Sequence, residues 1–169
     1  MKKQTLSILA FLILTSCGFQ PMYGTAFQSE QSAEIQNALE QVEIVNIPDW
    51  EGQYLRNALI DRFYRDHRPI NPEYVLTVNK IEERLIDLDI TKNSDATRGQ
   101  LQLKTAITLR DKKTGEVLLE RNLRSITSYN ILTSEFATRV TEQNTRRNAL
   151  DDLASQIELQ IGLYLKRDQ

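Results

Sequence analysis

Cys17 is the only cysteine among the 169 residues, and its surroundings indicate a specific chemistry. It follows two small residues, Thr15 and Ser16, and an apolar run over residues 6–14, with two lysines before the run. A basic start and a short apolar run are typical of an export signal, and the run is too short to span a bilayer. We therefore expect residues 1–16 to be a signal peptide.

The residues before Cys17 resemble a bacterial lipobox, in which small residues precede a cysteine. Such a thiolate is alkylated by a diacylglycerol, and after cleavage the new amino terminus takes a further acyl chain such as palmitate. Because each buried CH₂ contributes roughly 0.8 kcal/mol, two or three chains make the attachment effectively permanent. We predict lipidation of Cys17, with residues 17–40 as anchor and tether. The alternative is a buried cysteine at the edge of an ordinary signal peptide.

The sequence after the predicted signal has the size of one domain. It contains 153 residues, and its 19 basic and 23 acidic residues give a formal charge of −4, because the signal carries two lysines and no acid. It lacks the basic stripe with interleaved aromatics that nucleic-acid binders show. No later apolar run is long enough to cross a membrane. With Cys17 alkylated no disulfide can form, so packing alone must stabilise the domain.

Hydrophobic periodicity predicts an α+β domain over residues 41–169. The predicted elements are a strand at 42–47, a helix at about 50–66 with Asp49 as N-cap, strands at 74–90, at 101–109 and from Val117 to about Tyr129, and a helix from Thr133 or Ser134. Residues 33–41 predict a short helical turn at most. The order β-α-β-β-β-α predicts a four-stranded mixed β-sheet with two helices packed on one face. The first strand should lie parallel to a strand of the meander.

The predicted strand at 74–90 has an irregular pattern. Apolar residues occupy the even-numbered positions from Tyr74 to Val78 and again from Ile86 to Ile90, so a regular strand would place both runs on the same face. Charged residues occupy that face between the two runs. This pattern indicates a bulge, or a strand that projects past the core.

The last predicted helix has apolar residues at three- and four-residue steps, beginning with Phe136 and Val140 and reaching Leu165. Its middle section, residues 141–148, is polar and contains Arg146. We expect this section to overhang the sheet.

Residues that could support catalysis or bind a metal are sparse. His67 is the only histidine, and no cysteine lies within metal-ligand spacing of it. Asp87 and Asp89 lie two apart on a strand, where they could form an acid–base pair. Because Ile86 and Leu88 point the opposite way, a solvated outer face is the ordinary explanation. We therefore predict no catalytic residue, no metal and no cofactor.

Basic residues on or beside the predicted meander are the remaining candidates for binding. Arg98 and Lys92 flank one strand-to-strand loop, and Lys104, Arg121 and Arg124 lie near them. Guanidinium groups suit phosphate because they donate two parallel hydrogen bonds. A generic charged surface also explains such residues. We predict that Arg98 and Lys92 contact an anionic ligand.

Three segments carry a resemblance to a known family: Cys17-Gly18-Phe19-x-Pro21-x-Tyr23-Gly24, Ser128-Tyr129-Asn130, and Ser134-x-Phe136-Ala137. The chain resembles the lipopolysaccharide-assembly lipoproteins of the LptE family, particularly the alphaproteobacterial members. Met22 stands where the family pattern has leucine. The likeness spans essentially the whole sequence after the signal.

The resemblance implies a non-catalytic lipoprotein, lipid-anchored on the periplasmic side of the outer membrane. It would plug a large LptD-type β-barrel, assist assembly of that barrel and contact lipopolysaccharide. Gly18 after the cysteine is compatible with sorting to the outer membrane. Two alternatives stay open: a lipoprotein that activates a cell-wall synthase or serves an envelope transporter, and a hydrolase that uses Asp87 and Asp89.

Overall fold

The computed structural model describes residues 27–65, 67–90 and 96–167, and the chain divides into two compact units, residues 1–32 and 33–169. The elements are α2 (Phe27–Leu39), β1 (Val42–Ile44), α3 (Asp49–Phe63), β2 (Tyr74–Val78), β3 (Glu82–Ile90), β4 (Ala96–Asp111), β5 (Val117–Asn130) and α4 (Glu135–Arg167). The predicted signal peptide, Cys17 and Lys92 lie outside the described residues.

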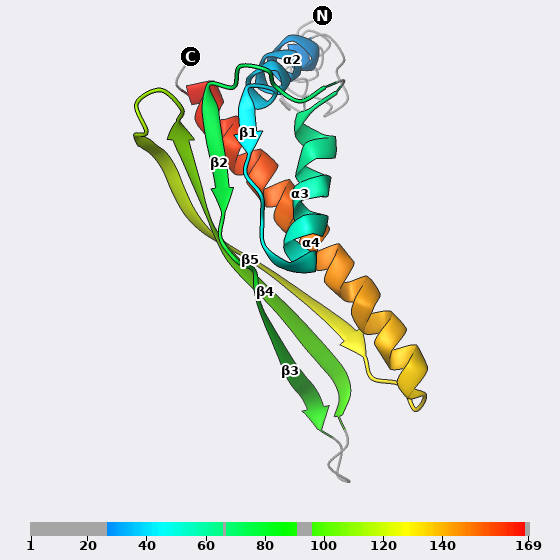
Figure 1. Cartoon of the computed structure of the whole chain (residues 1–169). Helices are drawn as coiled ribbons and strands as arrows, with labels where there is room; N and C mark the ends of the chain where they lie inside the picture. Colours follow the sequence, from blue (N-terminus) through cyan, green and yellow to red (C-terminus); the bar gives the residue numbers. More distant parts are fainter. Residues whose placement is uncertain (1–26, 66, 91–95, 168–169) are drawn as a thin grey trace, which may run out of the picture. The chain divides into compact units, whose positions relative to one another are not determined.

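The sheet is mixed, as predicted, and β4 is its centre (Figure 1). β1 runs parallel to β2, with α3 as the crossover between them, which confirms the predicted parallel pair. β5 occupies one edge of β4 along residues 98–110. β2 and β3 pair antiparallel with successive parts of the other edge, at residues 107–111 and 96–104.

The α+β class is therefore confirmed, but the prediction of four strands is wrong, because a bulge divides the strand predicted at 74–90. Val78 pairs with Ile107, and Glu82 pairs with Lys104. Three residues, 79–81, thus lie opposite two residues of β4. The sheet has five strands among the described residues.

The hydrophobic core lies between the sheet and the helices α3 and α4, which pack on the same face (Figure 1). On β4 the odd-numbered residues from Leu101 to Leu109 are buried, and the even-numbered residues between them are not. α4 contributes buried residues from Ala149 to Leu165. This alternation is the period of two expected for a strand with one covered face.

The prediction of two helices is also wrong, because α2 is a helix where the sequence predicted a short turn. Contacts with distant residues stabilise it. Leu39 is buried, and Ile35 lies so close to Gly162 of α4 that a Cβ there would come within 3.0 Å of it. The side chain of Gln36 donates a 2.9 Å hydrogen bond to the carbonyl of Phe63, an acceptor that the end of α3 would otherwise leave unpaired.

The ends of α3 and the burial of the first turns of α4 differ from the predictions. α3 ends at Phe63 rather than near residue 66, and Asp49 is its first residue, not its N-cap. Phe136 and Val140 were expected in the core, but their side chains are 79% and 41% exposed. The apolar face of α4 therefore begins only near Thr145, which is its first buried residue.

An ion cluster holds the polar middle of α4 against the sheet, so this section does not overhang. Arg146 donates hydrogen bonds to both carboxylate oxygens of Glu83 on β3, and the one from its Nε is 2.7 Å long. It also donates a 2.8 Å hydrogen bond to a carboxylate oxygen of Glu142. The Arg146 side chain is only 14% exposed. The hydrogen bonds to Glu83, followed by those to Glu142, raise the pKa of Arg146 and keep it charged, although its partial burial opposes them.

Replacing Arg146 by Gln should lower the free energy of unfolding by about 2 kcal/mol, because two partly desolvated carboxylates lose their partner. The neighbouring Arg147 is exposed, so Arg147→Gln should change stability by less than about 0.5 kcal/mol. Urea unfolding at pH 7 measures both variants. Equal losses would show that the cluster does not hold α4.

Candidate functional site

None of the described helices covers the face of the sheet that points away from α3 and α4. This open face consists of the even-numbered residues 82–88 of β3, 98–110 of β4 and 120–130 of β5, which the register places side by side. Ile86 and Leu88 lie here, opposite Gln100 and Arg98. The prediction that Ile86 and Leu88 point to the same face as Leu76 and Val78 is wrong. A one-residue bulge reverses the faces to which all later side chains of the strand point.

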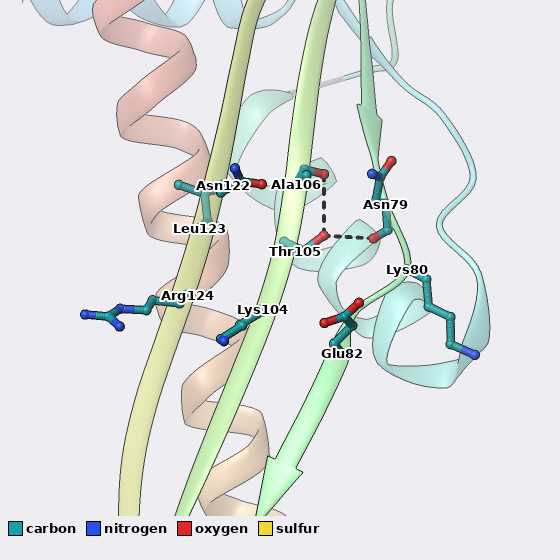
Figure 2. Close-up of a pocket in the computed structure, with 9 residues that line it drawn as sticks. All are labelled: Asn79, Lys80, Glu82, Lys104, Thr105, Ala106, Asn122, Leu123 and Arg124. Atoms are coloured by element: carbon teal, nitrogen blue, oxygen red, sulfur yellow. Dashed lines mark hydrogen bonds between the residues drawn. The ribbon is translucent and has the colours of Figure 1, made fainter.

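A hollow of about 500 Å³ lies at the bulge (Figure 2). Its lining comes from residues 79, 80 and 82, residues 104–106 of β4 and residues 122–124 of β5. Two hydrogen bonds hold the bulge in place. The Thr105 hydroxyl donates to the carbonyl of Asn79 at 2.8 Å, and the amide of Asn79 donates to the carbonyl of Ala106 at 2.9 Å. The bulge thus fixes one wall of the hollow.

Two cationic residues on neighbouring strands line this hollow. Lys104 and Arg124 are cross-strand partners, and their side chains project to the same side, away from β3, in Figure 2. Neither side chain forms a hydrogen bond or an ion pair within the described part of the chain. Like charges directly opposite each other in a sheet are destabilising. An anion bound between the two side chains would remove that repulsion.

The lining contains two other charged residues. One of them, Lys80, already forms an ion pair with Asp49. Its Nζ lies 2.9 Å from a carboxylate oxygen of Asp49, and this hydrogen bond raises the pKa of Lys80. Glu82 pairs in register with Lys104 on the side away from Arg124 but forms no ion pair with it in the described structure. The positive charge of the hollow therefore comes from Lys104 and Arg124, which suit a phosphate group.

The structure places Arg98 on the same open face, exposed, six residues before Lys104 on β4. That spacing corresponds to about 20 Å along a strand. Arg98 is a register neighbour of Leu88 and Asn130. The predicted contact residue Lys92 is not among the described residues, so the expected pair with Arg98 stays a prediction.

Sequence reasoning noted Lys104 and Arg124 but missed that they are neighbours. The hairpin turn around Gly115 contained the signal, because counting outward from a turn pairs the residues of its two strands. An irregularity between Leu109 and Arg110 shifts that count by one residue. The pairing was therefore predictable only to within one position.

The residues considered for catalysis do not form a site in the described structure. Asp87 is exposed but lies on the helix side of β3, opposite Gly99, and not on the outer face as predicted. The side chain of Asp89 is not described, and His67 is exposed. In the described ranges, no three His, Cys, Asp or Glu residues are placed to hold a metal ion. No helix there combines the length and the apolar composition needed to cross a membrane.

A family model described as LptE, lipopolysaccharide-assembly, matches residues 38–161. No curated protein sequence matches the chain significantly.

Several solved lipoprotein structures are similar in fold. A protein of Caulobacter crescentus assigned to the lipoproteins is 19% identical, with a TM-score of 0.62 over 79% of this chain and 97% of that chain. A minor lipoprotein from Acinetobacter baumannii is 22% identical, with a TM-score of 0.56 over 73% and 92%. The rare lipoprotein B from Shewanella oneidensis is 9% identical, with a TM-score of 0.58 over 75% and 96%. At these identities the likeness concerns the fold alone.

Proposed function

This chain belongs to the LptE family of lipopolysaccharide-assembly proteins, which are not enzymes, and on that premise we propose that it is an outer-membrane lipoprotein that partners a β-barrel translocon and contacts lipopolysaccharide. The observation that carries the proposal is the pair of unneutralised cations, Lys104 and Arg124, on a sheet face that no described helix covers.

The cationic pair suits the phosphates of lipopolysaccharide. In aggregates of this amphiphile, phosphates of neighbouring molecules are bridged by cations. A guanidinium and an ammonium group on paired strand residues would compete for these phosphates through charge-assisted hydrogen bonds. Because β4 and β5 are neighbours in one sheet, little side-chain ordering beyond the two cations is needed on binding. Arg98 would extend this contact along the open face, and Lys92 is a further contact residue predicted from the sequence.

Charge reversal tests this contact. Lys104→Glu and Arg124→Glu should each weaken lipopolysaccharide binding roughly tenfold, since a charge-assisted hydrogen bond contributes about 1.5–3 kcal/mol. Arg98→Glu combined with Lys92→Glu should also weaken it. Lys113→Glu makes the same charge change in the β4–β5 hairpin, outside the open face, and serves as the control. Titration with fluorescent lipopolysaccharide measures affinity, and equal binding by all variants would overturn the contact.

The lipid anchor is proposed for Cys17. We expect mass spectrometry of the exported protein to find Cys17 as the first residue, carrying a diacylglycerol and an amide-linked acyl chain. Cys17→Ala should release the protein from the outer-membrane fraction, because the acyl chains supply the attachment. Ser16→Gly keeps a small residue before the cysteine and should leave the attachment intact. An unmodified thiol in the exported protein would contradict this assignment.

The partner distinguishes the proposed role from its main alternative. A plug must be rigid and hydrophilic enough to face a barrel lumen, and such lumens are polar. Photo-reactive residues at Lys113 and Leu159, both exposed, should capture a large LptD-type outer-membrane β-barrel in cells. Capture of a cell-wall synthase or an inner-membrane ATPase instead would favour a role in wall synthesis or another transporter.

A further inference from the structure

Three apolar side chains lie on the open face near the cationic pair, two on β3 after the bulge and one on β5. We call Ile86, Leu88 and Ile126 the apolar strip. None of them belongs to the hydrophobic core, and Ile126 is 44% exposed. Ile126 follows Arg124 on the same face of β5, whereas Ile86 and Leu88 lie opposite Gln100 and Arg98. The strip therefore begins in the row next to Lys104 and Arg124.

We propose that the apolar strip binds the acyl chains of the lipopolysaccharide molecule whose phosphates contact Lys104 and Arg124. The inference rests on the proposed function and adds a second, apolar part to that site. An amphiphile presents its phosphates next to its fatty acids, and the open face presents cations next to apolar side chains. Removing acyl surface from water supplies binding free energy in proportion to the area buried.

The charges around the strip support this occupant. The three rows of the open face that contain the strip hold the basic residues Arg84 and Arg98 and no acidic residue, since the other members are Gln100, Gln102, Ser128 and Asn130. The acidic residues of the open face, Glu82 and Glu120, lie at or beyond the row of Lys104. The acyl part of an anionic amphiphile would therefore meet no carboxylate along these three rows, and Glu82, in the row of the phosphates, lies on the side of Lys104 away from Arg124.

A barrel wall fits the strip less well. Residues that face the lumen of an outer-membrane barrel are predominantly polar, so contact with them would leave Ile86, Leu88 and Ile126 without apolar partners. Fatty acid chains supply such partners without requiring hydrogen bonds. The strip thus matches the acyl part of the cargo, and not the wall of the translocon.

Two ligands that differ only in their fatty acids test the inference. One is fully acylated lipopolysaccharide, and the other is the same material after alkaline removal of all fatty acids, which keeps its phosphates. The variant is Ile86→Thr, Leu88→Thr and Ile126→Thr together, because threonine is more polar and has a β-branched side chain suited to strands. Leu159→Gln with Leu163→Gln removes two exposed apolar side chains from α4 and is the control.

The strip variant should bind acylated lipopolysaccharide roughly tenfold or more weakly than the wild type, and deacylated material equally well. The α4 control should match the wild type with both ligands. Thermal unfolding should show that all variants are folded, as expected for partly exposed positions. If the strip variant retains wild-type affinity for the acylated form, the inference is wrong. The strip variant should also be tested on phosphatidylcholine vesicles that contain no lipopolysaccharide. If its binding to these vesicles falls by the same factor, the strip binds bilayer lipid, and the inference is wrong.

The experiment distinguishes failure of this inference from failure of the proposed function. If Lys104→Glu and Arg124→Glu weaken binding of both ligands while the strip variant changes neither, the phosphate contact stands and the acyl contact falls. If the wild type binds neither ligand, both are overturned.

Discussion

The extra residue between β2 and β3 determines which side chains of β3 point to the core side of the sheet and which to the open face. Before it, alternation along β2 directs Leu76 and Val78 into the core. After it, the same alternation directs Ile86 and Leu88 to the open face and Glu83 toward α4. Side chains in a strand repeat every two residues, so a shift of one residue reverses them all. The Thr105 hydroxyl, bound to the Asn79 carbonyl, stabilises this reversal.

α4 is bound to the sheet by two kinds of interaction as a result. Its second half packs apolar residues such as Leu153, Ile157 and Ile161 against the sheet and α3. Its middle meets β3 where the bulge has placed Glu83, and Arg146 forms the contact there. Ion pairs of this kind contribute less net stability than apolar packing, because the charges must be desolvated, but they require one geometry. α4 is thereby held against β5 and β4 by packing and against β3 by Arg146.

This arrangement leaves the open face uncovered by the described helices, so that it is available to the ligand proposed above. The core and the ion cluster both lie on the helix side of the sheet. The cations and apolar residues of the open face stay accessible on strands whose spacing the sheet fixes. A family that assembles lipopolysaccharide handles a molecule with both phosphates and fatty acids, and a rigid face with both kinds of complementary group matches that chemistry. No reacting group is required, because such a protein works by binding.

The sequence by itself determined the α+β class, the alternation of residues 101–109 and the parallel first strand, because these follow from local periodicity and short connections. For residues 74–90 it indicated an irregularity but left open whether this is a bulge or a strand that projects past the core. The signal peptide and Cys17 remain predictions from the sequence alone. Only the tertiary structure decided that Ile86 and Leu88 lie outside the core, that Lys104 adjoins Arg124, that α2 is a helix and that Phe136 is exposed. Each of these depends on pairing or burial between residues far apart in the chain, which local propensity and periodicity do not encode.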